Sequence, residues 1–426
     1  MIDEGSPLQP PGKHHGWTVT FVGMGINLAL GILYTWSVIS KDVPASWRWS
    51  EADKSWPYSI ACLVFCLVMV PAGRMQDRIG PRIVATIGGL LVGLGMILAS
   101  FTTTPLGYIL GFGVLAGMGI GFGYAAATPP AVKWFPGAKT GLIAGLVVSG
   151  FGLASVYAAP LTKWLIGSVG LGKAVLILGI GFLVIVTGLA QMLKPPPKGY
   201  VPAGTPALKP GATGKKEEFT PSEMLRTWQF YLLWFMYACG AGAGLMVISK
   251  LAKIASSQAG LELGFILVAV LAIGNGAGRI GAGVLSDRIG RKATLFICFV
   301  IQTVMIALLS QAKTGNVLAS AGVLAVISAL IGANYGANLS LFPSLTKDFY
   351  GLKNFGVNYG LVFTAWGLGG FTSSLLAGMA YDGKIVESWK NSFNCAYYAS
   401  MALLVVSAIV TFAVKPPHRI AEPGQA

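Results

Sequence analysis

The sequence predicts an all-α membrane protein with 12 transmembrane helices in two pseudo-symmetric six-helix bundles. Three observations predict this class. The 426 residues are 54% hydrophobic and only 11% charged, with a mean hydropathy of +0.69. Apolar segments of membrane-spanning length recur along the whole chain, and one polar loop motif occurs twice. Such a composition is typical of a protein that crosses the bilayer many times.

Twelve apolar segments have the length of about 20 residues that a helix needs to cross the hydrocarbon of a bilayer. The first six are predicted at 17–39, 56–75, 82–101, 106–128, 140–162 and 172–193. The second six are predicted at 229–250, 263–284, 292–311, 316–342, 356–380 and 394–414.

One long polar connection divides the spans six and six. We expect a tail at 1–16, an N-terminal bundle at 17–193, a linker at 194–228, a C-terminal bundle at 229–414 and a tail at 415–426. The linker is rich in Pro, Gly and Lys, which is typical of a flexible connection. Its end, Thr220-Pro221-Ser222-Glu223, has the form of a capping box, so a short helix is predicted before the seventh span.

The net charge of +15 comes from basic residues in short connections between apolar spans. Because they do not gather on one soluble face, we expect no nucleic-acid partner. Most of them fall on the side of the two termini, and short cytoplasmic loops are the ones that concentrate Lys and Arg. The sequence therefore predicts a multi-pass protein of the cell (inner) membrane, embedded in the lipid bilayer with both termini cytoplasmic.

A ten-residue loop motif occurs once in each half. Residues 73–82 (GRMQDRIGPR) recur as residues 283–292 (GVLSDRIGRK), and each copy joins the second and third predicted spans of its half. Such a repeat implies an internal duplication, and in duplicated transporters the substrate site lies near the midplane between the repeats. The motif resembles the signature of the major facilitator superfamily, and the resemblance extends over residues 17 to 414. It implies that the cytoplasmic side is held shut by Asp77, Arg78, Asp287 and Arg288.

Shorter segments are similar to one branch of that superfamily. They are GILYTWS at 31–37, EMLRT at 223–227 followed by QF at 229–230, LFPS at 341–344, DFYG at 348–351 and NYG at 358–360. They resemble the oxalate:formate antiporter family, which is related to the monocarboxylate transporters, and the resemblance implies transport of small carboxylates. In the oxalate-exchanging members a lysine stands eight residues after the Asn of Asn-Tyr-Gly, where this chain has Trp366. That departure favours a substrate with one carboxylate, such as lactate.

Arg279 lies within the predicted eighth span, in the segment GNGAGRIG at 274–281. A charged side chain at membrane depth costs about 2.5 kcal/mol or more, so it is retained where it faces a cavity and serves a pathway. The planar guanidinium fork suits a carboxylate. Asn275 is four residues earlier, on the same helix face, where it either donates to the substrate or holds Arg279 in place. We predict that Arg279 binds the substrate anion.

Further candidates follow from their positions in the spans. Tyr124 and Tyr335 occupy similar places in the two repeats, and their hydroxyls could donate to the anion or simply pack in the bundle. Tyr34 is a further candidate. Four apolar residues have two possible roles. They either form a wall around a methyl or short alkyl group of the substrate or simply pack in the bundle; they are Leu28, Leu146, Phe363 and Trp366.

The sequence predicts a carrier and not an enzyme. The three histidines lie in the predicted tails, so the spans hold no buried acid–base constellation. The five cysteines fall in or beside apolar spans without metal spacing, and we expect them to be packing residues. No cofactor and no metal are therefore expected.

The proton is the expected second substrate. An anion that enters against an interior-negative potential loses about 2.3 kcal/mol per 100 mV, whereas an anion with a proton is electroneutral. This favours proton symport of a monocarboxylate by alternating access. Exchange of the oxalate/formate type is the alternative, and a carboxylate sensor that does not transport is an alternative of another class. No acidic residue is predicted at mid-membrane, so the proton-carrying group is not identified and Asp382 is the nearest candidate.

Overall fold

The structure is a computed structural model that describes residues 15–135, 140–197, 200, 202, 218–262, 264–351 and 354–417. Within these residues there is no strand, and twelve helices are long and apolar enough to cross a membrane. All twelve predicted spans are confirmed. The seventh span is longer than predicted, since its helix continues to Ala259, and the second begins earlier, at Glu51.

Six spans precede the linker. Their elements are α1 (His15–Leu30) with η1 (Gly31–Thr35) and α2 (Trp36–Lys41), α3 (Glu51–Ile79), α4 (Pro81–Ser100), α5 (Pro105–Tyr108) with η3 (Ile109–Ala116) and α6 (Gly117–Val132), α7 (Thr140–Val169) and α8 (Leu171–Ala190). A short turn, η2 (Ala45–Trp47), lies in the connection from α2 to α3.

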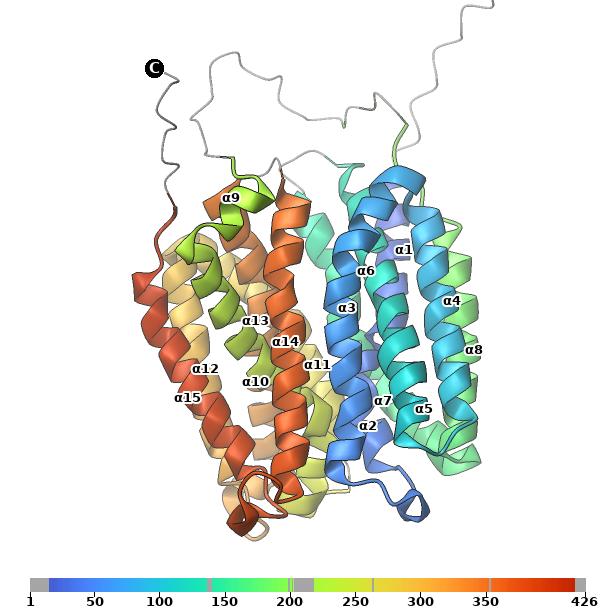
Figure 1. Ribbon diagram of the computed structural model, residues 1–426, viewed down its shortest axis with the longest axis vertical. Helices are drawn as coiled ribbons and strands as arrows, with labels where there is room; N and C mark the ends of the chain where they lie inside the picture. The colour runs from blue at the N-terminus through green and yellow to red at the C-terminus, as the bar shows by residue number, and fades with distance from the viewer. Residues whose placement is uncertain are drawn as a thin grey trace, which may run out of the picture.

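Six spans follow the linker. Their elements are α10 (Trp228–Ala259), α11 (Gly264–Ile289), α12 (Arg291–Ser310), α13 (Ala321–Tyr350), α14 (Phe355–Tyr381) and α15 (Asn394–Ala413). The short elements are α9 (Pro221–Leu225), η5 (Val317–Ala319) and η6 (Glu387–Trp389). The two sets of six lie side by side, and α3 packs against α14 between them (Figure 1). We call the end of the molecule that carries α9 the linker end.

The predicted helix before the seventh span is confirmed as α9. The Thr220 hydroxyl accepts from the Glu223 N–H at 3.3 Å, and the Glu223 carboxylate accepts from the Thr220 N–H at 2.7 Å. These two bonds form the capping box. The side-chain amides of Asn354 and Asn358 each donate to the Phe219 carbonyl at 3.1 Å. The end of the linker is thereby fixed to the start of α14.

The two copies of the loop motif adopt the same backbone. Gly80 has φ of +88° and Gly290 has φ of +90°, a left-handed region that favours glycine. Each glycine separates two helices of its half, α3 from α4 and α11 from α12. The shared geometry agrees with the internal repeat that the sequence predicts.

Close helix packing positions Arg279. An added Cβ at Gly274 or Gly278 of α11 would overlap the carbonyl group of Ala329 or Ala333 on α13. Small residues at this spacing let two membrane helices approach backbone to backbone. Packing of the same kind joins α6 to α4, since an added Cβ at Gly119 would lie 2.5 Å from the Gly88 carbonyl oxygen. The helix that carries Arg279 is therefore held in one register against α13.

Candidate functional site

Arg279 is buried between the two sets of six helices, with a side chain only 7% exposed. Its Nε donates to Oδ1 of Asn275 at 3.1 Å, and its Nη1 donates to the backbone carbonyl of Val148 on α7 at 2.8 Å. Both partners are neutral. Among the described residues, Nη2 of Arg279 and Nδ2 of Asn275 are buried and have no hydrogen-bond partner. Two N–H donors of this site are thus unused.

A pocket lies beside the Arg279 guanidinium, and in this conformation its side chains close it so tightly that no water molecule fits inside. Its lining comes from helices of both sets: Tyr34, Phe65, Tyr124, Phe151, Arg279, Leu339, Phe363 and Trp366. Apart from the guanidinium, the indole and two phenols, the lining is apolar. Charge–dipole and ionic interactions are stronger in such a low-dielectric environment than in water. The arrangement suits a small anion with one charged end and one apolar end.

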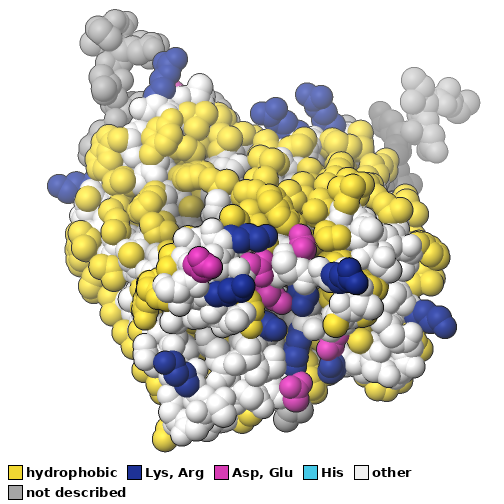
Figure 2. Space-filling view, turned by 60° about the horizontal axis from the view of Figure 1, so that its bottom comes forward, with side chains coloured by type: hydrophobic (Ala, Val, Ile, Leu, Met, Phe, Trp, Pro, Cys, Tyr) yellow, Lys and Arg dark blue, Asp and Glu magenta, His cyan; other side chains and the backbone are white. Residues whose placement is uncertain are grey.

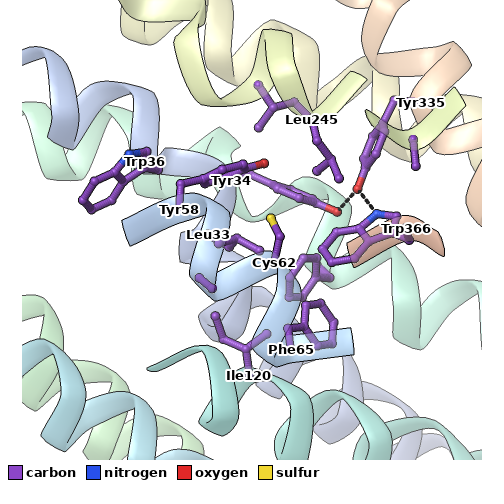
Figure 3. Close-up of a cluster of buried hydrophobic side chains, with 14 of the residues drawn as sticks. Leu33, Tyr34, Trp36, Tyr58, Cys62, Phe65, Ile120, Leu245, Tyr335 and Trp366 are labelled. Atoms are coloured by element: carbon purple, nitrogen blue, oxygen red, sulfur yellow. Dashed lines mark hydrogen bonds between the residues drawn. The ribbon is translucent and has the colours of Figure 1, made fainter. Parts of the chain in front are cut away.

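A chain of hydrogen bonds runs along one side of this cavity (Figure 3). Trp366 Nε1 donates to the Tyr335 hydroxyl at 2.8 Å, and the hydroxyls of Tyr335 and Tyr34 are 2.5 Å apart. Tyr34 belongs to η1 in the first set of helices, whereas Tyr335 and Trp366 belong to α13 and α14 in the second. The chain therefore links the two sets through buried polar groups whose partners are supplied.

The structure brings most of the predicted site residues together. Arg279, Tyr124, Phe363 and Trp366 line the cavity, Asn275 is bonded to Arg279, and Tyr335 is one hydrogen bond from the lining. Leu28 and Leu146 are half-buried and are not part of this lining. Their backbone carbonyls instead accept from the hydroxyls of Tyr157 and Ser149.

The sequence did not identify several residues that line the pocket, and it gave Tyr34 only a minor place. Tyr34 takes a central place because its hydroxyl reaches Tyr335. Phe65, Phe151 and Leu339 also line the cavity. These three are apolar residues in apolar helices, so no signal in the sequence separates them from ordinary packing residues.

The loop motif of the second half places its ion pairs on Arg291. Arg291 Nη1 lies 2.8 Å from Asp287 Oδ1, and Nε lies 3.4 Å from Asp348 Oδ2 at the end of α13. The predicted gating residues Arg78 and Arg288 are exposed, and Asp287 is exposed as well. The Asp77 side chain lies outside the described residues. Within the second half, the contact expected of Arg288 is thus made by Arg291.

A second buried cation lies at the end opposite the linker. Lys250 on α10 is 2% exposed and lies 3.4 Å from Oε2 of Glu51, the first residue of α3. Figure 2 shows basic and acidic side chains gathered at this end. Lys250 is the last residue of the predicted span 229–250, and the sequence did not single it out. Because α10 continues to Ala259, Lys250 lies within the helix and not at its end.

Asp382 caps a helix at the same end. Its two carboxylate oxygens accept from the backbone N–H groups of Glu51 and Ala52 at 3.0 and 2.9 Å. The carboxylate therefore caps the N-terminus of α3. In the part of the chain that the structure describes, no group of three or more His, Cys, Asp or Glu residues is placed to hold a metal ion.

Comparison with known proteins agrees with this fold. The family model of the Major Facilitator Superfamily matches residues 16–374 and 245–426, so the chain belongs to that superfamily. The chain is 32% identical over 355 residues to the uncharacterized MFS-type transporter YhjX of Escherichia coli, covering 82% of this chain and 85% of that protein. It is 28% identical to the oxalate:formate antiporter of Oxalobacter formigenes, covering 79% of this chain and 77% of that protein.

Relatives named as monocarboxylate transporters also match the chain. The resemblance inferred from the motifs is therefore confirmed for the superfamily and for this branch. A solved structure of a bacterial homologue of the lysosomal transporter Spinster shares the fold, with a TM-score of 0.69 at 16% identity, covering 95% of this chain and 98% of that one. The protein is a transporter of the Major Facilitator Superfamily.

Proposed function

We propose that the protein carries a small monocarboxylate, of which L-lactate is the model, across the cell membrane together with a proton. The observation that carries the proposal is the unused donor Nη2 of Arg279, beside a pocket with largely apolar walls. A carboxylate that enters when this pocket opens would satisfy the donor and neutralise the one buried guanidinium there. Unsatisfied buried polar groups are costly, which favours occupation by an anion.

The number of charges favours one carboxylate on the substrate. The cavity lining contains one cation, and Trp366 occupies the position at which oxalate-exchanging relatives have a lysine. Trp366 uses its N–H on Tyr335 and stacks on Phe363 at 5.0 Å between ring centroids. A second carboxylate would find no cation there and would stay uncompensated in a low-dielectric site.

The transport cycle alternates access between the two sets of six helices, with both termini in the cytoplasm. The charge bias of the loops supports this orientation. Proton symport is supported by energetics, since an electroneutral pair moves without opposing the membrane potential. The linker end is then cytoplasmic, and the end that carries Glu51 and Lys250 is the outer end.

Uptake into proteoliposomes tests the proposal. Labelled L-lactate is expected to accumulate when the outside is made acidic. Arg279→Gln should lower uptake by roughly a hundredfold or more, because both the positive charge and the charge-assisted hydrogen bond from Nη2 to the carboxylate are lost. Arg226→Gln, which removes an exposed arginine after α9, is the control and should transport normally. Normal uptake by Arg279→Gln would show that the site is misassigned.

Exchange is the second candidate, favoured by the similarity to the oxalate:formate antiporter. In that case uptake requires formate or oxalate inside the vesicles and does not respond to the pH gradient. A sensor would bind carboxylate without moving it. The same vesicles, loaded with or without internal formate, separate these three functions.

A further inference from the structure

The Lys250 ammonium is buried, and it contacts the Glu51 carboxylate of the other set of helices. Its Nζ lies 3.4 Å from Oε2 of Glu51 and 3.2 Å from the Glu51 backbone carbonyl oxygen. Lys250 belongs to α10 and Glu51 begins α3, so the pair joins the two sets of six helices at the outer end. The structure thus already contains a carboxylate seated on Lys250.

Glu51 is shared among three ammonium groups. Lys54, on the same helix, lies 3.0 Å from Glu51 Oε1, and Lys253, one turn after Lys250 on α10, lies 4.0 Å from the same oxygen. The Lys253 ammonium also stands 5.3 Å from the ring centroid of Tyr381. One carboxylate therefore serves two cations of α10 and one of α3.

The other acids nearby are already engaged. Both oxygens of Asp382 cap α3, and the nearest cation to that carboxylate is Lys384, at 3.9 Å. Asp53 accepts from the backbone and hydroxyl of Ser50 in the capping box of α3. The positive charges of α10 thus depend on Glu51 for a carboxylate.

Opening of the outer end would divide this cluster. Glu51 and Lys54 would move with α3, whereas Lys250 and Lys253 would stay on α10. Glu51 would keep Lys54 as its partner, and the two lysines of α10 would lose theirs. A buried charge without a partner is unfavourable, so this surface would accept a carboxylate from solution.

We propose that Lys250, together with Lys253, is a second carboxylate-binding site at the outer mouth, filled by Glu51 when the outer end is closed and by the entering substrate when it is open. The inference rests on the proposed function, because it requires alternating access. Glu51 is then a tethered competitor of the substrate. The substrate meets the point charge of Lys250 first and the fork of Arg279 second.

Kinetics of uptake from the outer side test the proposal in the full-length chain in proteoliposomes. Lys250→Met should raise the outside KM for L-lactate about tenfold or more, because a charge-assisted bond to the carboxylate is lost. Glu51→Gln should lower the same KM, because the competitor is removed. Lys41→Met is the matched control: Lys41 pairs with the exposed Glu262 across the same interface, at 2.8 Å, and its loss should leave the KM unchanged.

An ion pair that only holds the outer end shut predicts a different pattern of KM changes. If the pair only holds the outer end shut, Lys250→Met and Glu51→Gln break the same contact and shift the outside KM in the same direction. That result overturns the proposal. Should Lys250→Met fail to fold, Lys253→Met is used instead, since its side chain is 30% exposed. A rise of about threefold is expected for it, and an unchanged KM for Lys253→Met then overturns the proposal.

A binding measurement separates this site from the transport function. In purified Glu51→Gln/Arg279→Gln protein, saturation-transfer NMR with L-lactate should still detect binding, and addition of Lys250→Met should abolish it. Equal signals with and without Lys250 overturn the outer site. If instead wild-type vesicles move no small carboxylate while this signal depends on Lys250, the proposed transport function fails and the outer site stands.

Discussion

Arg279 and Lys250 are both buried cations, but the chain treats them differently. Among the described residues, the Arg279 guanidinium donates only to neutral groups, an amide and a backbone carbonyl, and its Nη2 has no hydrogen-bond partner. The Lys250 ammonium has a carboxylate within 3.4 Å. A buried charge needs compensation from somewhere. The chain supplies a carboxylate counterion at the outer end, and among the described residues it supplies none at the centre.

The two buried cations also differ in residue type. Arginine offers a planar fork that is held in place while it binds, and two of its nitrogens are anchored here by Asn275 and Val148. Lysine offers a compact charge on a flexible stem, which suits a partner that arrives and leaves. The central cation is thus held in place by two anchors, whereas the outer cation stands on a flexible stem beside a carboxylate.

The largest expected effect is on stability and concerns the outer pair. Glu51→Gln leaves Lys250 buried without its counterion, and we expect a loss of about 3 kcal/mol from the free energy of unfolding. The double variant Glu51→Gln/Lys250→Met should recover most of that loss, because both charges are gone. Thermal denaturation of the four proteins in a double-mutant cycle measures the coupling. Additive losses would show that the two residues do not act as a pair.

The next effect concerns the shape of the central cation. Arg279→Lys keeps the charge but loses the fork and its two anchors, so we expect uptake of L-lactate to fall by roughly ten- to a hundredfold. Initial uptake rates in proteoliposomes give the measurement. Arg226→Lys is the matched control, because it makes the same change at an exposed arginine after α9 and should change uptake less than about threefold. Equal losses in Arg279→Lys and Arg226→Lys would show that the planar guanidinium is not needed at the centre.

Much of the fold and part of the site could be predicted from the sequence. The twelve spans follow from hydropathy, and the repeat follows from one loop motif with a left-handed glycine in each copy. Arg279 stood out because a charge interrupts an apolar window, and Asn275 followed from helical spacing. Each of these signals is local, so no tertiary information was needed.

The remaining features depend on contacts between distant segments. The bond from Arg279 to the Val148 carbonyl and the contact of Tyr34 with Tyr335 join helices from opposite sets, and no local pattern encodes them. Hydropathy falls near helix ends, so Glu51 lies outside the predicted second span and Lys250 is the last residue of the predicted seventh. Their burial comes from the approach of α3 to α10 and is invisible in either segment alone.

A smaller change in KM is expected when the space around the Arg279 guanidinium is reduced. An added Cβ at Gly152 on α7 would lie 3.3 Å from Cζ and 3.4 Å from Nη2 of Arg279. Gly152→Ala should therefore displace the guanidinium by a few tenths of an ångström and raise the KM for L-lactate about two- to fivefold. Gly145→Ala on the same helix is the control, since nothing lies within 4 Å of its added Cβ. Equal KM values for the two variants would show that the guanidinium position is not restricted.

The smallest effect is expected at the exposed ion pair beside the buried one. Lys41 hydrogen-bonds to Glu262 and holds the pKa of that carboxyl below its ordinary value. A lowered folded pKa means that the pair stabilises the closed outer end above the ordinary glutamate pKa of about 4.3 and loses this contribution as the pH falls below it. Since the Glu262 side chain is 82% exposed, solvent screens the interaction.

Glu262→Gln should therefore leave the midpoint of thermal denaturation unchanged at neutral pH in both low and high salt. Glu51→Gln, at the buried ion pair of the same interface, should lower that midpoint under both conditions, because salt reaches a buried pair poorly. A salt-sensitive loss of equal size in both variants would mean that burial does not distinguish the two pairs. The contrast drawn here between counterions supplied by the chain and counterions supplied from solution would then fail at the outer end.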